Sequence, residues 1–182
     1  MKRCSWLNLK NNKYIKYHDE EWGQAVYDDK KLFEMLILEI FQAGLSWEII
    51  LNKRDGFRIC FDDFDINKII NYNDIKIKEL LNDNRIIKNK LKIEATINNA
   101  KVFKNIQSEY KTFSNYIWNF TKNKTIYETN KTSSQLSDVV SKDLRKKGMK
   151  FIGSTIIYSY LQAIGIIYSH DKECFMYRKE VK

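Results

Sequence analysis

The sequence has no proline and very few of the residues that form disulfides or bind metals. Its 182 residues include only three cysteines and two histidines. Three cysteines cannot all pair within one chain, and a chain of this length buries enough apolar surface to fold without covalent cross-links. The count therefore favours a reduced, intracellular setting over a disulfide framework.

Long apolar runs, repeats and flexible linkers are also absent. No stretch approaches the roughly 18 apolar residues that suggest a membrane span, and the basic N-terminus lacks the apolar segment of a signal peptide. We therefore expect no membrane contact and a cytoplasmic location. Because no Gly/Ser-rich segment divides the chain, we expect a single domain over residues 1–182, with two closely packed helical lobes as the alternative.

Positive charge and aromatic rings, by contrast, are abundant. The chain has 32 basic and 23 acidic residues, a net charge of +9, and an aromatic share of 14%. The charge suits a polyanionic partner that is bound through its phosphates. The alternative is a coding bias that raises lysine everywhere, since asparagine and isoleucine are also common. The aromatic rings either build the core or form a pocket for a flat heterocycle.

Apolar residues recur at helical spacing along most of the chain, and strand-like alternation is scarce, so we expect an all-α fold. Start and stop signals place several boundaries. Asp28 opens a helix that Gly44 ends, and Ser46 opens the next helix, which Gly56 ends. Ser137 is the expected cap of a later helix. The expected helices span residues 28–44, 47–55, 66–71, 74–83, 88–110, 138–147 and 154–165.

Each histidine has a cysteine near it in the sequence. Thirteen residues separate Cys4 from His18, and three separate His170 from Cys174. The second pair fits one face of a helical turn, whereas the first pair needs a loop that folds back. Together the four would make a closed Cys2His2 set, which suits a structural, tetrahedral zinc ion joining the chain ends. The alternative is a core histidine that is satisfied by other partners and has an incidental cysteine nearby.

One carboxylate falls on an apolar helix face. Within residues 28–44, Glu39 shares its face with Leu32, Met35 and Leu36, whereas Glu34 lies on another side, where it can reach water. A buried carboxylate costs several kcal/mol unless it is paired, so it generally has a partner or a task. The structural interpretation is an ion pair or a hydrogen bond to a tyrosine hydroxyl. The functional interpretation is a carboxylate that faces a ligand pocket.

Several long stretches follow one another in a recognisable order. They are "RCSW" (3–6), "YIKYHDEEWG" (14–23), "KKLFEMLILEIFQAGLSW" (30–47), "IIKNKLKIEATINNA" (86–100) and "KKGMKFIGSTIIYSYLQAIG" (146–165), followed by His170 and Cys174. Over nearly the whole chain they resemble the bacterial 3-methyladenine DNA glycosylase I family. The resemblance implies a compact helical DNA-glycosylase fold with a divergent helix-hairpin-helix element. It also implies one structural zinc ion per chain, held as a staple between the termini by Cys4, His18, His170 and Cys174.

The resemblance implies a function in base excision repair. The family flips 3-methyladenine out of DNA and hydrolyses its N-glycosidic bond, which leaves an abasic site. We therefore expect a bacterial, nucleoid-associated monomer whose partner is double-stranded DNA containing alkylated adenine. By resemblance, Glu39 and Tyr17 are the catalytic residues and hydrogen-bond the edge of the base. The expected base-binding rings are Trp47 and Tyr14, which stack on the base, and Trp6 and Trp22, which wall the cavity.

Further DNA contacts are expected in two segments. Leu45, in "AGLSW", is the candidate wedge that fills the space left by the flipped base. In the hairpin stretch "NDNRIIKNKLK", Lys88 and Lys90 are the candidates for phosphate binding, and Asn89 is a candidate for a neutral contact. These contacts would hold DNA without reading its sequence.

Two stretches depart from the family pattern. The hairpin has Asn84 and Arg85 where such loops often use glycine at positive φ, and asparagine is the expected substitute. Residues 121–135 match the family poorly and are expected to form a surface loop. Two other functions stay open: a zinc-stapled helical DNA-binding protein without catalysis, and a glycosylase for another alkylated base.

Overall fold

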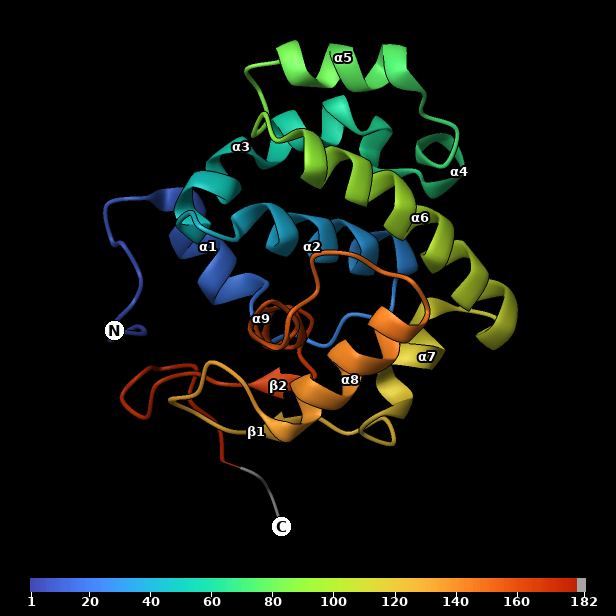
Figure 1. Cartoon of the computed structure of the whole chain (residues 1–182). Helices are drawn as coiled ribbons and strands as arrows, with labels where there is room; N and C mark the ends of the chain where they lie inside the picture. Colours follow the sequence, from blue (N-terminus) through green and yellow to red (C-terminus); the bar gives the residue numbers. More distant parts are fainter. Residues whose placement is uncertain (180–182) are drawn as a thin grey trace.

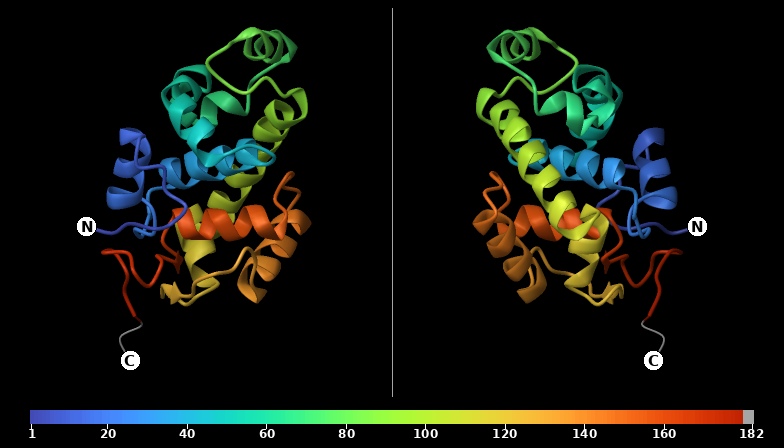
Figure 2. Two further views of the ribbon diagram at one scale, coloured as in Figure 1. Left: turned by 90° about the vertical axis from the view of Figure 1, so that its left-hand side faces the viewer. Right: turned by 90° about the vertical axis from the view of Figure 1, so that its right-hand side faces the viewer.

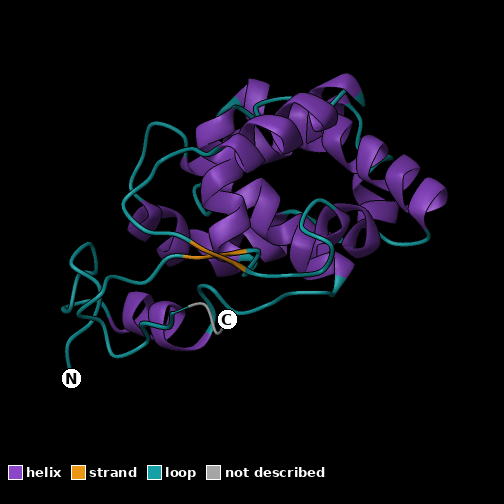
Figure 3. Cartoon of the chain, turned by 90° about the horizontal axis from the view of Figure 1, so that it is seen from below, coloured by secondary structure: helices purple, strands orange, loops and turns teal. Residues whose placement is uncertain are grey.

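Helices make up almost all of the regular structure. The structure is a computed structural model, and it describes residues 1–179. The elements, in chain order, are α1 (Asn12–Glu20), α2 (Asp29–Gln42), α3 (Trp47–Cys60), the 3-10 helix η1 (Asp62–Phe64), α4 (Ile66–Ile69), α5 (Asp74–Asn82), α6 (Lys90–Tyr110), α7 (Phe113–Asn119), β1 (Ile126–Tyr127), α8 (Gln135–Lys146), α9 (Ser154–Ala163) and β2 (Ile167–Tyr168). The two short strands pair parallel (Figure 3). The all-α prediction is confirmed apart from this pair.

Helix α2 forms the centre of the fold. Every residue from 32 to 41 is buried, so the helix has almost no solvent-exposed face in this region. It packs against α3, α6, α7 and α9. Figure 1 shows it crossing the middle of the molecule, with α3 to α6 above and α9 below. Because α2 carries Glu39, the burial of the whole helix fixes that carboxylate in the interior.

The other helices lie on two sides of α2. Helices α3, α4 and α5 lie on one side, and α7, α8, α9 and the strand pair lie on the other, as the views in Figure 2 also show. The N-terminal segment meets the segment that follows β2, because Phe175 N donates to Lys2 O at 2.8 Å and Ser5 N donates to Asp171 Oδ2 at 2.6 Å. The ends of the chain are thus held together. None of the helices in residues 1–179 combines the length and apolar character needed to cross a membrane.

Helix α3 continues past Gly56, so the prediction that this glycine ends the helix is wrong. A Cβ atom added at Gly56 would lie 2.6 Å from the backbone oxygen of Arg85 and 2.7 Å from its Cβ. The connection between α5 and α6 therefore crosses α3 at this point. Glycine is needed here for the close approach of two segments.

The start of α8 also differs from the prediction. Its N-cap is Ser134, and Ser137 lies in the first turn, where its hydroxyl accepts a hydrogen bond from Ser134 N at 2.8 Å. The two serines thus form a reciprocal capping box. By contrast, α2 ends just before Gly44, which has a φ of 84°, and Ser46 caps α3, both as predicted.

Candidate functional site

A cavity of about 410 Å³ opens between α1, α2 and α9. Its volume lies at the lower end of the usual range for small-molecule sites. It is lined by all six residues that were predicted to surround a base, namely Trp6, Tyr14, Tyr17, Trp22, Glu39 and Trp47. The fold therefore brings together side chains from the N-terminal segment, α1 and the segment just after it, α2 and the first residue of α3.

The aromatic side chains in the cavity support one another. Tyr14 and Tyr17 lie one turn apart on α1 and are both buried. The ring centroids of Tyr17 and Trp47 are 5.3 Å apart, those of Trp6 and Tyr14 are 5.5 Å apart, and Trp6 meets Trp22 edge-on at 4.9 Å. These separations are typical of aromatic pairs in protein interiors. The rings therefore form an aromatic wall made of two contacting groups, Trp6 with Tyr14 and Trp22, and Tyr17 with Trp47.

Besides the half-buried Asp171, one acidic side chain lines the cavity: Glu39. It is 4% exposed, and no other residue within 1–179 pairs with its carboxylate by a hydrogen bond or an ion pair. Burial raises its pKa to about 8. Burial, with a contribution from Glu39, also raises the pKa of Tyr17 well above its ordinary value, so the hydroxyl keeps its proton. Within residues 1–179, Glu39 therefore forms neither the ion pair nor the tyrosine hydrogen bond of the structural interpretation.

Sequence reasoning missed the polar residues of the cavity. These are Ser5, Gln42, Asn130, Lys131, Ser159, Gln162, Ser169 and Asp171. Two of them come from the stretch 121–135, which was expected to be only a surface loop. This stretch contains β1, which pairs with β2 and so brings Asn130 and Lys131 to the cavity. Because this stretch matches the family poorly, the resemblance did not place it at the cavity. The only local sign of a strand was the short apolar pair at residues 126–127.

The four predicted metal ligands lie together at the chain ends. One ligand atom from each of Cys4, His18, His170 and Cys174 falls within 4.8 Å of the other three, and all four residues are buried. His170 Nδ1 lies 3.4 Å from Cys4 Sγ and 3.6 Å from Cys174 Sγ, and His18 Nε2 lies 3.5 Å from Cys174 Sγ. This group could hold a metal ion. The segment 169–174 is not helical, so the predicted helical turn is wrong, although the two side chains do meet.

The donor set fits a tetrahedral ion. With metal–sulfur bonds of about 2.3 Å and metal–nitrogen bonds of about 2.0–2.1 Å, the sulfur–nitrogen edges of a tetrahedron measure about 3.5 Å. The three separations above match that value. The other ring nitrogen of His18 lies 2.7 Å from Asp19 Oδ1, and Arg3 binds the same carboxylate at 2.7–3.0 Å. Such an outer carboxylate orients a histidine ligand.

Comparisons with known proteins show which family the chain belongs to. Residues 6–177 match the protein family described as Methyladenine glycosylase. DNA-3-methyladenine glycosylase 1 of Escherichia coli (strain K12) is 39% identical over 183 residues, which cover 97% of each chain. A crystal structure of 3-methyladenine DNA glycosylase I has a TM-score of 0.93 at 37% identity, covering 97% of this chain and 100% of the other. The chain belongs to the methyladenine glycosylase family.

A third relative shows the family with its base. It is a tyrosine-to-phenylalanine variant of 3-methyladenine DNA glycosylase I in complex with 3-methyladenine, with a TM-score of 0.92 at 32% identity, and it covers 98% of this chain and 99% of the other. The methyladenine glycosylase match over residues 6–177 includes every predicted site residue except Cys4. The matched residues therefore include the six predicted cavity residues and three of the four predicted metal ligands.

The predicted DNA-contact residues of this methyladenine glycosylase lie at two connections. Leu45 lies in the turn between α2 and α3 and is 36% exposed. Lys88 and Lys90 are exposed at the start of α6, where Lys90 also pairs with Glu94 at 3.7 Å. Asn89 caps α6 by accepting from Lys92 N at 3.1 Å, so its side-chain oxygen is already used.

The loop between α5 and α6, where a hairpin was predicted, is not left-handed at the two expected positions. Asn84 was expected to substitute for glycine at positive φ, but neither it nor Arg85 has a positive φ. Arg85 is instead bound to Asp83, with its Nη2 2.6 Å from Asp83 Oδ2. The side chain of Asp83 also accepts from Arg85 N at 2.8 Å. Local contacts between Asp83 and Arg85 thus hold this loop without a positive φ at either expected position.

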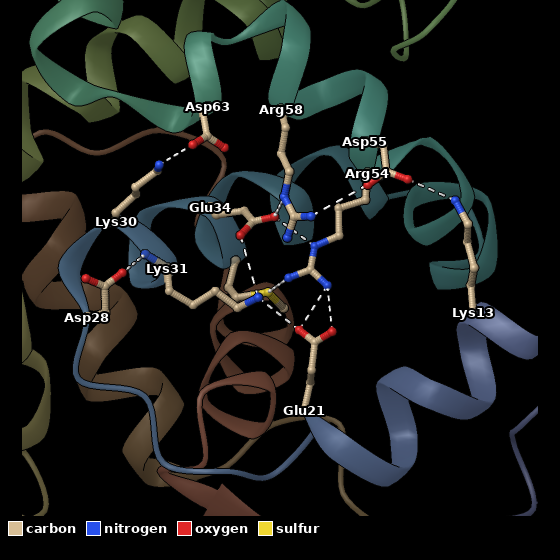
Figure 4. A network of polar contacts seen from close by, with 11 residues as sticks. Lys13, Glu21, Asp28, Lys30, Lys31, Glu34, Arg54, Asp55, Arg58 and Asp63 are labelled. Carbon is tan, nitrogen blue, oxygen red and sulfur yellow. Dashed lines mark hydrogen bonds and ion pairs between the residues drawn. The ribbon is translucent and has the colours of Figure 1, made fainter.

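A buried ion-pair network holds α1 in place beside the cavity. Contrary to prediction, Glu34 does not reach water: it is 6% exposed and accepts from Arg54 at 2.7 Å and Arg58 at 2.8 Å, because α3 covers this side of α2. Arg54 also binds both oxygens of Glu21, just after α1, at 2.9 and 3.1 Å (Figure 4). Since α1 carries Tyr14 and Tyr17, this network fixes the aromatic wall against α2 and α3.

Proposed function

We infer that this protein is a DNA glycosylase that flips 3-methyladenine out of alkylated DNA and hydrolyses its N-glycosidic bond, leaving an abasic site. Family membership over nearly the whole chain supports the class of reaction, and the relatives are named for this substrate. The observation that carries the proposal for this chain is the Glu39 carboxyl group, which is buried in an aromatic cavity and has no polar partner among residues 1–179.

The charge of the damaged base explains why such a cavity would recognise it. 3-Methyladenine is cationic while attached to the sugar and neutral once released, whereas normal adenine is neutral in DNA. Aromatic faces attract a cation, and a desolvated carboxylate does so more strongly. An undamaged adenine gains neither interaction, so the cavity would select damage by charge as well as by shape.

The predicted residues have different roles in binding the base. Trp47 and Tyr14 stack on the flipped base, and each such contact is worth roughly 1–3 kcal/mol. Glu39 and Tyr17 bind its polar edge. Their separation from bulk water strengthens both interactions. This assignment is supported by their common position in the cavity wall and by the short distance between the Tyr17 and Trp47 rings.

Hydrolysis of this bond does not require a side chain that acts as a strong general acid. Water forms a bond to C1′ of the sugar as the bond from C1′ to the base nitrogen breaks. The electron pair of the broken bond neutralises the positive charge of the base, and the proton of the attacking water passes to solvent. Because the leaving group departs neutral, no side chain has to protonate it. Positioning, desolvation and charge recognition are therefore the main contributions of Glu39 and the aromatic wall.

DNA binding is proposed to involve the two connections near the cavity. Lys88 and Lys90 neutralise phosphates of double-stranded DNA, Asn89 adds a neutral contact, and Leu45 fills the space left by the flipped base. The protein acts on the nucleoid in the cytoplasm, as a monomer of one domain. The exposure of Leu45, Lys88 and Lys90 supports these roles.

We also propose that the metal is zinc and that its role is structural. Cys4, His18, His170 and Cys174 would fill all four positions of a tetrahedral ion, so no position stays open for water or substrate. Zinc bound there supplies cross-linking between the chain ends rather than Lewis-acid chemistry. The tetrahedral fit of the ligand separations supports this assignment.

The proposal is tested by identifying the released base. The protein is incubated with DNA treated with a methylating agent, the free bases are separated by chromatography, and abasic sites are counted in the DNA. We expect 3-methyladenine and an equal number of abasic sites. Release of a different methylated base would indicate another glycosylase specificity. Binding without any release would leave the non-catalytic DNA-binding protein as the correct assignment.

A further inference from the structure

One buried cation outside the cavity has an unusual set of partners. Lys92, in the first turn of α6, is 7% exposed, and its Nζ donates to the backbone oxygens of Phe41 at 3.0 Å and Ala43 at 2.8 Å. Burial lowers its pKa, and within residues 1–179 no acidic side chain forms an ion pair with it. A buried ammonium group is costly unless its partners are well placed. Here those partners are two carbonyl groups at one helix end.

These carbonyls belong to the C-terminal end of α2, where backbone oxygens lack partners within their own helix. A cation near a helix C-terminus also interacts favourably with the helix dipole. Lys92 therefore caps α2 from a different helix. Within the same turn, Gln42 Nε2 donates to Leu45 O at 2.8 Å, and Leu45 N donates to Gln42 O at 2.7 Å. The turn 43–46 is thus held by its own hydrogen bonds and by Lys92 from α6.

The turn and the lysine belong to two segments that must act together on DNA. The turn presents Leu45 and leads directly into Trp47, the first residue of α3, which lines the cavity. Lys92 follows Lys90 by two positions, at the end of α6 where phosphates are proposed to bind. A shift of about 1 Å between such segments is enough to cost a large factor in rate.

We propose that Lys92 is a positioning residue that fixes the turn carrying Leu45 and Trp47 relative to the phosphate-binding end of α6. DNA held at its phosphates then meets the wedge and the stacking ring at a fixed distance. The ammonium group touches neither base nor phosphate, and it acts through the backbone of Phe41 and Ala43. This inference rests on the proposed excision of 3-methyladenine.

The test compares two substitutions with a matched control. Lys92→Met keeps length but removes the donors, and Lys92→Arg keeps donors and charge. The control is Asn99→Ala, two turns further along α6. Asn99 is fully buried and ties α6 to another loop through the backbone of Lys150, at 2.8 and 2.9 Å. The Asn99→Ala substitution therefore removes a similar tertiary hydrogen-bond contact that lies away from the turn 43–46.

We expect Lys92→Met to slow single-turnover release of 3-methyladenine by about tenfold to a hundredfold. It should also reduce base flipping, read from the fluorescence of 2-aminopurine beside the lesion. Affinity for undamaged duplex and its salt dependence should stay unchanged, because Lys88 and Lys90 remain. Lys92→Arg should restore most of the rate. Asn99→Ala should lower the melting temperature without slowing release below that temperature.

Equal rates for Lys92→Met and Asn99→Ala at matched stability would overturn the inference and make Lys92 a purely structural cap. If Lys92→Met does not fold, Lys92→Gln replaces it, since its shorter amide can still donate to one carbonyl. Intermediate loss of flipping is then expected, and wild-type flipping would overturn the inference. Failure of the wild-type protein to release 3-methyladenine would instead contradict the proposed function itself.

Discussion

The protonation state of Glu39 depends on whether the cavity holds a cation. Burial raises the pKa of this carboxyl group to about 8, so the free protein holds it mostly protonated at neutral pH. An opposite charge close by lowers the pKa of a carboxyl group. Arrival of a cationic base therefore favours loss of the proton and formation of a charge pair. A neutral adenine cannot induce this change, which adds to its exclusion.

The raised pKa predicts how stability changes with pH. In the unfolded chain Glu39 ionises near its ordinary value of 4.5, and in the folded protein near 8. Between these values the unfolded state binds fewer protons than the folded state, so the free energy of unfolding falls as pH rises. Glu39→Gln removes this effect. Its stability relative to wild type should therefore rise from pH 5 to pH 8, by on the order of a few kcal/mol, and level off above.

Urea unfolding of both proteins at several pH values measures this difference, because the contributions of all other groups cancel. A difference that does not vary between pH 5 and pH 8 would show that Glu39 ionises normally in the folded protein.

At the scale of the helices, the cap of α3 was predictable, the cap of α8 was placed three residues too late, and tertiary contacts were not predictable. Ser46 was identified as the cap of α3 because a short polar side chain ahead of an apolar helix signals its start. Gly56 was misread because its cause, the backbone of Arg85, lies far away in the sequence. Glu34 was placed toward water for the same reason: helical spacing gives its direction on α2 but does not show that α3 covers that side.

The cavity residues also divide into those that local sequence patterns predicted and those that only tertiary contacts bring there. Its aromatic residues and Glu39 stand in long, family-like stretches, so sequence patterns identified them. Lys131 and Asn130 reach the cavity only because β1 pairs with β2, and a two-residue strand leaves almost no periodic signal.

The start of α6 gives a prediction about DNA binding. If Lys88 and Lys90 each neutralise one phosphate, their substitution by alanine should lower the slope of log affinity against log salt by about 0.9 per lysine. Lys104→Ala is the matched control, because Lys104 lies fourteen residues after Lys90 on α6 and thus about 21 Å from it along the helix. Titration of undamaged duplex at several salt concentrations measures the slopes. Equal slopes for the lysine pair and the control would mean that the positive charge at this end reflects composition alone.

At the scale of the whole molecule, the two end segments meet at the four residues of the Cys2His2 group, beside hydrogen bonds such as those from Phe175 N to Lys2 O and from Ser5 N to Asp171 Oδ2. The sequence identified the four residues from their rarity and their pairing, but it misjudged the path of the chain, since residues 169–174 form a turn instead of a helix. Spacing alone cannot distinguish these, because a turn can also bring side chains four residues apart together.

Removal of the metal should therefore destabilise both ends together. Structural zinc contributes on the order of 10–16 kcal/mol in small peptides, and the large core here should make the loss much smaller. A chelator should lower the melting temperature by about 5 °C or more. Hydrogen exchange should increase in residues 1–20 and 168–179 together, with little change in α2. Unchanged stability of the metal-free protein would contradict a structural role.

Single-turnover release of 3-methyladenine by Glu39→Gln tests the central claim most directly. The amide keeps the shape of the side chain but removes the counter-charge for the cationic base, so release should slow by about tenfold for each 1.4 kcal/mol of lost transition-state stabilisation. Binding to undamaged duplex should hardly change. Asp29→Asn is the matched control: this carboxylate at the opposite end of the same helix accepts from Phe113 N and Ser114 N at 2.8 Å, outside the cavity, so its loss should lower stability and leave release intact. Wild-type release by Glu39→Gln with a weakened fold would show that Glu39 is structural and that the base binds elsewhere.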